Sequence, residues 1–131
     1  MYIADNNNYQ VRLLNATTNL VSTLAGAYTT AVPRVAVDGP AASAVFISPA
    51  AVAVDPAGGK VYVADTYAIR VIDTQNMFVT TVAGSLSTSG YVDGAGTVAR
   101  FRDAFALALD STRGILVRGF VWVPAWGLMH V

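Results

Sequence analysis

The chain has 131 residues, of which 54% are hydrophobic and only 12% are charged, with a formal net charge of zero. The length suits one domain, and the charged fraction is about half of the ~25% that is typical of soluble domains. Zero net charge removes the general attraction that a nucleic-acid or acidic-substrate binder uses. The sequence has no cysteine, which excludes disulfides, thiolate metal sites and a cysteine nucleophile, and its single histidine, His130, argues against a Ser-His-Asp triad or a histidine metal site.

No targeting or membrane segment is expected. The chain turns polar by Asp5, so it lacks the apolar stretch of a secretory signal, and no apolar run reaches the ~18 residues of a membrane helix. We therefore expect no membrane partner. Glutamate is absent and Val, Ala and Thr are abundant, which favours many short buried strands over helices.

The sequence repeats itself along its length. The run 1–5 (MYIAD) returns at 61–65 (VYVAD), an offset of 60, and the runs 11–14 and 20–26 return at an offset of 58. The run 38–59 returns in outline at 93–114, an offset of 55. The changes in offset fall between apolar runs and never inside them, as insertions in loops between strands would.

The best-formed unit contains four short runs that predict strands over 50–54, 60–64, 68–72 and 78–83. Each run is rich in β-branched or small residues and is bounded by turn residues such as Asp, Pro, Gly and Asn. The first two runs do not alternate, which predicts burial on both faces, and the polar content rises along the unit. We therefore predict four antiparallel strands, with burial decreasing from the first strand to the fourth.

Four such strands per unit are typical of a propeller blade. The order of the motifs, namely Asp-Gly, Ala-x-Phe, AVD, YVAD, Ile-Arg and TLAG or TVAG, resembles the NHL-repeat family of β-propellers over residues 1 to about 117. Two positions depart from the family pattern: Ala104 stands where the family has proline, as at Pro49, and the family's Asn-His is Asn8-Tyr9 in the first copy and deleted in the second. The resemblance implies an all-β fold built from four-stranded antiparallel blades.

On this basis the chain divides into parts of blades. Strands two to four of one blade cover 1–26, a full blade covers about 50–84, and the first strands of a third cover 105–117. A six-bladed ring of this class needs roughly 270 residues, so the chain is expected to be a fragment of roughly two to two and a half blades.

The tail 118–131 leaves the repeat pattern. It holds both tryptophans, Trp122 and Trp126, and the only histidine. A shifted reading frame, a retained intron or a junction explains such a change at a repeat boundary, and a genuine capping strand is the alternative. The two tryptophans are therefore not interpreted as a binding site.

The eight aspartates are the only acidic side chains. Most end strands or precede glycine, as Asp38 and Asp93 do, where a carboxylate accepts hydrogen bonds from nearby backbone N–H groups and shapes a turn. Recurrence at equivalent positions favours a structural role. The resemblance to lactonase-like and strictosidine-synthase-like propellers would allow a divalent cation in the channel, but its ligands would come from several blades. No catalytic, cofactor or metal residue is assigned.

Arg12 and Arg70 recur at one position of the third strand. The structural interpretation is an Asp–Arg pair or a stem lying across the blade, and the functional one is a ring of cations that binds RNA. Arg100 and Arg102 form a small basic patch with aspartates beside it.

Three further patterns are local. Asn15-Ala16-Thr17 fits the N-glycosylation pattern and falls in a predicted turn. The glycines at 58–59 and 94–96 are interpreted as turn glycines, because neither has the strand-to-helix context of a phosphate loop.

Topology indicates where a partner would bind. In an up-and-down blade, the loops between strands two and three and between successive blades emerge at one end, which carries residues 6–10, 66–67, 27–49 and 85–104. The residues assigned to partner contact are Tyr9, Arg34, Tyr67, Arg100 and Arg102.

The functional hypothesis is a non-catalytic scaffold for protein–protein interaction, without cofactor. The alternatives are a fragment of a propeller enzyme, amidating-lyase-like or lactonase-like, with its metal ligands on other blades, and RNA binding through a basic face. Because an isolated fragment leaves apolar sheet faces uncovered, self-association is also expected.

Overall fold

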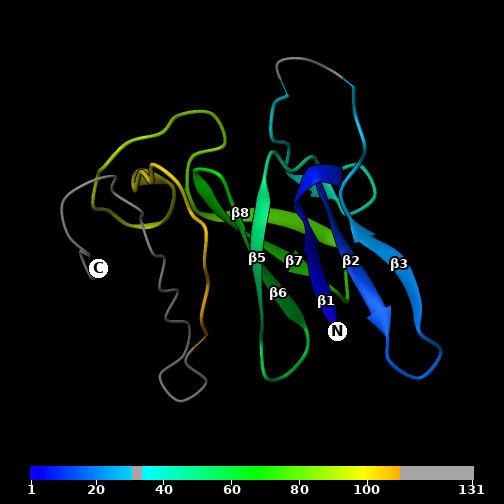
Figure 1. Ribbon diagram of the computed structural model, residues 1–131. Helices are drawn as coiled ribbons and strands as arrows, with labels where there is room; N and C mark the ends of the chain where they lie inside the picture. Colours follow the sequence, from blue (N-terminus) through cyan, green and yellow to red (C-terminus); the bar gives the residue numbers. More distant parts are fainter. Residues whose placement is uncertain (31–33, 110–131) are drawn as a thin grey trace, which may run out of the picture.

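The computed structural model describes residues 1–30 and 34–109, which form two antiparallel sheets (Figure 1). The first sheet has the order β1-β2-β3, and the second has the order β4-β8-β7-β6-β5. The strands are β1 (Tyr2–Asp5), β2 (Gln10–Asn15), β3 (Leu20–Ala25), β4 (Gly39–Pro40), β5 (Pro49–Val54), β6 (Lys60–Asp65), β7 (Ala68–Asp73) and β8 (Phe78–Gly84). Two single-turn 3₁₀ helices, η1 (Asn6–Asn8) and η2 (Gly96–Val98), are the only helical elements in the described ranges. The all-β prediction is confirmed.

The four strands predicted over 50–83 are confirmed as β5 to β8, each within two residues of the expected ends. They form an antiparallel meander in which each strand pairs with the next along the chain. Tight turns connect them because polar residues and glycine supply the local bonds. In the β5–β6 turn the N–H of Gly58 donates to the carbonyl of Asp55 at 2.7 Å, and Gly58 has a φ of +76°.

The two sheets repeat one another in register. Ile3 pairs with Arg12 in the first sheet as Val63 pairs with Arg70 in the second. The ladder between the next two strands has an irregularity at the same place in both, between Val11 and Arg12 and between Ile69 and Arg70. A bulge at equivalent positions of two sheets indicates a structural repeat. Such bulges change the direction of the side chains that follow them.

The predicted decrease in burial along the unit is wrong for the first strand. β6 and β7 are almost fully buried, whereas the central residues of β5 are only half-buried and β8 is mixed. The reason is position in the sheet: β5 is an edge strand with one neighbour, while β6 and β7 have a strand on each side.

Two apolar clusters cover the two faces of the second sheet. The larger lies between the sheets and joins Val11 and Ala25 to Phe46, Val63 and Val79. The smaller lies on the opposite face, where Ala64 and Ile69 pack with Ala104, Phe101 and Leu107. The second sheet is therefore enclosed between the first sheet and the segment that follows β8.

The segments between the units repeat as well. Residues Val37 and Val45 form an isolated antiparallel bridge, and Val92 and Arg100, 55 positions later, form the same bridge. Of the third-unit strand predicted from 105, the residues 105–109 form no ladder, and positions 110–117 lie outside the described residues. The tail 118–131, with Trp122 and Trp126, also lies outside them. No helix among the described residues is long and apolar enough to cross a membrane.

Candidate functional site

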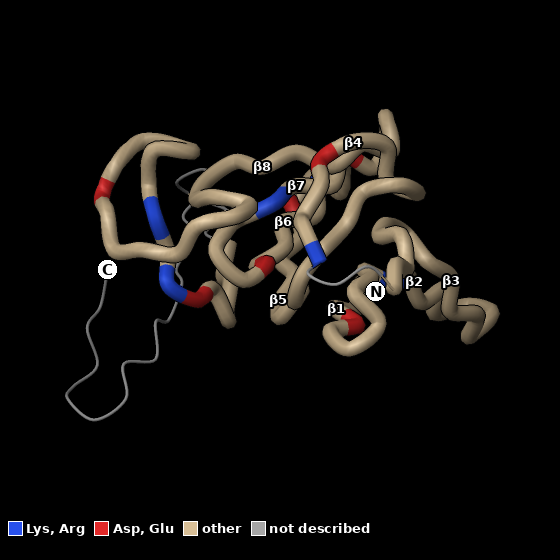
Figure 2. The backbone as a smooth tube through the Cα atoms, turned by 90° about the horizontal axis from the view of Figure 1, so that it is seen from above, with Lys and Arg blue, Asp and Glu red and all other residues tan. Residues whose placement is uncertain are grey.

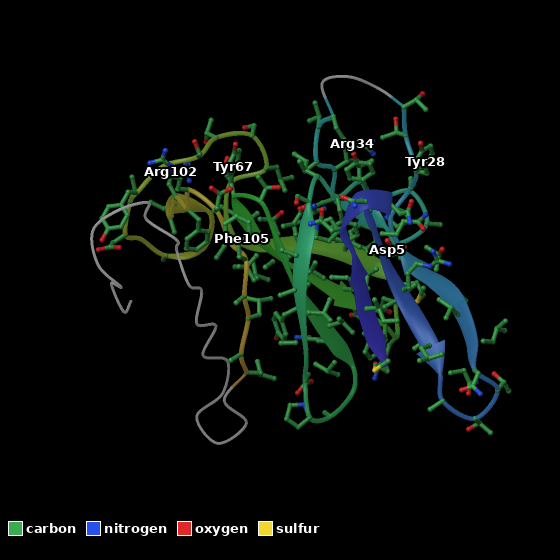
Figure 3. The ribbon with its side chains drawn as sticks, viewed as in Figure 1. Asp5, Tyr28, Arg34, Tyr67, Arg102 and Phe105 are labelled. Carbon is green, nitrogen blue, oxygen red and sulfur yellow. The ribbon has the colours of Figure 1, made fainter. Side chains whose placement is uncertain are left out.

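The end of the sheets predicted to bind a partner is formed by four connections. The β1–β2 connection runs through η1 and Tyr9, the β6–β7 turn is Thr66–Tyr67, and the long segments 27–48 and 85–104 complete the set. Figure 3 shows labelled side chains from these connections at one end of the sheets, with Arg34 and Tyr28 over the first sheet and Tyr67 and Arg102 beside the second. We call this the loop end. The predicted residues therefore come from loops that share one end, but they divide into two groups.

The first group is Tyr9 and Arg34. The guanidinium carbon of Arg34 lies 3.4 Å from the centroid of the Tyr9 ring, a cation–π contact. Tyr9 has a φ of +60°, which places its ring at the corner where η1 passes into β2. The Nη1 atom of Arg34 is buried and has no hydrogen-bond acceptor among the described residues. Nη1 is therefore a buried donor that the described residues leave unpaired.

The second group is Tyr67, Arg100 and Arg102. Arg100 directs Nη1 at backbone carbonyls of η2 and of Ala99, at 2.7 Å for Ala99, so its charge secures its own loop. Arg102 is exposed, and no salt bridge to it is present in the described part of the chain. Tyr67 is half-buried and contributes its carbonyl to the N–H of Ser85 at 3.1 Å. Of this group, Arg102 is the cation presented to solvent.

The structural interpretation of Arg12 and Arg70, an Asp–Arg pair, is confirmed in both sheets. Arg70 is fully buried and binds Asp65 at 3.0 Å and Asp38 at 2.8 Å, whereas Arg12 binds Asp5 at 3.3 Å with 27% of each side chain exposed. Figure 2 shows a basic and an acidic position side by side at β6 and β7. These arginines belong to the framework and form no ring of free cations in the described sheets.

Asp65 fastens the segment before β5 to the end of β6. Its Oδ1 accepts the N–H groups of Ile47 at 2.9 Å and Ser48 at 2.7 Å. Burial raises the pKa of Asp65 above its ordinary value, and the two N–H groups and Arg70 oppose that effect.

Asp55 and Asp73 have the expected turn role. The Oδ1 atom of Asp73 accepts the N–H groups of Gln75 and Asn76, and these bonds lower the pKa of its carboxyl group. Asp55 likewise accepts the N–H of Ala57 at 3.3 Å.

The prediction that Asp38 shapes a local turn is wrong. Its carboxylate accepts hydrogen bonds from Arg70 Nε at 2.9 Å and from the backbone N–H of Thr81, 43 residues away, also at 2.9 Å. The side chain therefore bridges two strands of the second sheet and bonds none of its own neighbours.

Sequence reasoning missed the contacts of two glycines. Gly26 and Gly84 have φ values of +108° and +85°, and a Cβ atom on them would lie 2.7 Å and 2.2 Å from the carbonyl oxygens of Tyr9 and Tyr67. Each also lies against a phenylalanine of the next segment, Phe46 or Phe101. These contacts position the loop end, because they hold the chain leaving β3 and β8 close to the preceding loop.

Open grooves also lie on the surface of the described residues. The larger, about 650 Å³, lies between the ends of β2 and β3 and the turn at 40–42, and its hydrogen-bonding side chains include Gln10, Thr23 and Tyr28. The other, about 390 Å³, is lined by Lys60 and Asp73 with neighbours on β7 and β8. Across residues 1–30 and 34–109, no three His, Cys, Asp or Glu side chains gather where they could hold a metal ion.

Asn15 lies at the end of β2 and is exposed. Its Oδ1 accepts the N–H groups of Thr17 at 2.9 Å and Thr18 at 3.3 Å, so it caps the β2–β3 turn.

Comparison with solved structures finds chains of similar fold. The chain resembles a structural genomics protein of unknown function from Bacteroides thetaiotaomicron, with 26% sequence identity and a TM-score of 0.69. The match covers 81% of this chain and 26% of the other, so this chain spans about a quarter of its relative. No family model matches the sequence, and no curated protein does.

Proposed function

We propose that residues 1–117 are part of an NHL-type β-propeller, and that this propeller is a non-catalytic scaffold for a protein partner. Three observations support the propeller. The two sheets have the same register and the same bulge, the connecting segments repeat the same bridge, and the second sheet is enclosed on both faces. Face-to-face stacking of four-stranded meanders is how propeller blades are arranged.

The scaffold role rests on one observation, the composition of the loop end. It combines a tyrosine-supported guanidinium that keeps an unpaired donor, at Tyr9 and Arg34, with an exposed arginine at Arg102. Tyrosine and arginine are the residues that carry binding energy at protein interfaces, because they combine large contact area with directed hydrogen bonds. Loops held by a rigid sheet framework are the usual place for such recognition.

Site-directed photo-cross-linking of the full protein in extract of its source organism tests this proposal. A photoreactive residue at Tyr67 or Arg102 is expected to capture one defined protein, and the same residue at the exposed Ala57, in the β5–β6 turn at the other end of the second sheet, is not. Arg34→Glu is expected to reduce the captured yield about tenfold or more.

Two results would overturn the scaffold role. Stoichiometric tight binding of Ca²⁺ in a calorimetric titration would favour the enzyme alternative. RNA binding whose affinity falls steeply with salt would favour the nucleic-acid alternative.

A further inference from the structure

The buried Arg70 lies on the face of the second sheet that is turned toward the first sheet, and all its donor nitrogens are hydrogen-bonded. Its Nε binds Asp38, and its two terminal nitrogens bind the carbonyl oxygens of Val37 at 2.8 Å and Val45 at 3.2 Å. All three partners belong to residues 37–46, which we call the Asp38 segment. That segment fills the space between the first sheet and the Arg70 face of the second.

The first sheet presents the same face, and none of the described residues covers it as the Asp38 segment covers the second sheet. Ile3, Arg12, Leu14 and Val21, which we call the Arg12 face, are the repeat equivalents of Val63, Arg70, Ile72 and Val79. The four residues of the second sheet are fully buried, whereas Val21 is 44% exposed and the Arg12 side chain 27%.

Arg12 also keeps an unmet donor. Its Nη1 binds Asp5, but its Nε is buried and bonds to no acceptor in the described part of the chain. Nε is the atom with which Arg70 holds Asp38. A carboxylate presented as Asp38 is would satisfy this atom.

The chain carries a second segment of that kind, residues 92–101, which we call the Asp93 segment. It has the bridge of the Asp38 segment, between Val92 and Arg100, with backbone bonds of 2.9 and 3.3 Å. Phe101 lies against Gly84 as Phe46 lies against Gly26.

Asp93 itself is exposed, and no hydrogen bond or ion pair reaches it among the described residues. Asp38 meets its arginine 32 residues later in the chain, but the corresponding position after Asp93 is Ala125. Within residues 1–30 and 34–109, Asp93 thus has no cation beside it, and Arg12 Nε has no carboxylate.

We propose that the Arg12 face docks the Asp93 segment of a second copy of this chain, head to tail. Arg12 Nε donates a hydrogen bond to the carboxylate of Asp93, and the terminal nitrogens of Arg12 donate to the carbonyl oxygens of Val92 and Arg100. The two surfaces are different patches of one chain, so the contact is heterologous and each copy can engage two others.

Sedimentation velocity of the purified chain over a range of concentrations tests the docking. Wild type is expected to associate in a concentration-dependent manner, more weakly as salt is raised. Arg12→Gln and Asp93→Asn, which change charge and not backbone, are each expected to raise the dissociation constant about tenfold or more. Lys60→Gln is the matched control, because Lys60 is an exposed cation outside both surfaces, and it should associate as wild type does.

Mixing the two variants distinguishes this contact from nonspecific association. The Arg12→Gln copy keeps an intact Asp93 segment, and the Asp93→Asn copy keeps an intact Arg12 face, so an equimolar mixture should form one-to-one dimers that grow no further. Circular dichroism of each variant confirms that it is folded. Monomeric wild type, single variants that associate as wild type does, or a mixture that stays monomeric would each overturn the proposal.

Discussion

Replacing Arg70 with alanine should cost far more stability than the same change at Arg12, although the two residues occupy one position of the repeat. Arg70 is fully buried and its partner Asp65 has 1% of its side chain exposed, so Arg70→Ala leaves a buried carboxylate without its cation. Breaking a buried pair in this way costs about 3–5 kcal/mol. The Arg12–Asp5 pair is 27% exposed on both sides, and such pairs contribute only about 0–1 kcal/mol.

Urea unfolding followed by far-ultraviolet circular dichroism measures the difference. With a denaturant dependence of roughly 2 kcal/mol per molar, Arg70→Ala should lower the midpoint by about 2 M and Arg12→Ala by less than about 0.5 M. The protein concentration is kept low enough that the chain is dissociated. Equal losses for the two variants would refute the reasoning, because they would show that burial of the pair does not set its contribution.

Arg70→Lys provides a graded control. Lysine keeps the positive charge beside Asp65. Its single ammonium group cannot replace the planar guanidinium that bonds Asp38 and the carbonyl oxygens of Val37 and Val45 together. Its loss of stability should therefore lie between those of wild type and Arg70→Ala.

Two further predictions concern the turns. Gly84→Ala should destabilise the protein much more than Gly58→Ala. Both glycines have positive φ, but a Cβ at Gly84 would lie 2.2 Å from the Tyr67 carbonyl oxygen, whereas a Cβ at Gly58 would meet open space. Equal shifts in thermal midpoint would contradict the close approach. The second is a pH effect. Because folding lowers the pKa of Asp73, its carboxylate contributes to the free energy of unfolding above the unfolded-state pKa of about 3.9, and this contribution is lost as pH falls through the folded-state pKa. Asp73→Asn should therefore flatten the acid limb of a stability-versus-pH curve. An unchanged acid limb would show that Asp73 is not a source of that dependence.

Strands β5 to β8 could be predicted from sequence because each is a short run of β-branched or small residues between turn formers, and the repeat supplied a second copy of β6 to β8. The short strand β4 was not predicted, because a Gly-Pro pair is typical of a turn. The Asp–Arg pairs were within reach for the same reason, since Asp65 and Arg70 are close in sequence and recur as Asp5 and Arg12.

Long-range partners were not within reach. The bond from Asp38 to Arg70 joins residues 32 apart, and local spacing does not show which carboxylate fills a buried site. The burial of β5 was overestimated because an apolar run records what a strand can bury, whereas its position at a sheet edge decides what it does bury. At the loop end, the sequence predicted which connections emerge together, but only the folded geometry shows that Arg34 lies on Tyr9 and that Arg100 bonds its own loop.

The short strand β4 has a consequence for how this protein can grow. β4 pairs with the outer strand β8 through Gly39 and Pro40, and it ends the second sheet on that side. Proline has no N–H group, so it offers no donor to a further strand, and a two-residue edge is too short to template one. Strand-by-strand extension, the route by which open sheets aggregate, is therefore blocked at this border. On the β4 side, a further sheet is therefore accommodated by stacking onto a face and not by lengthening the ladder.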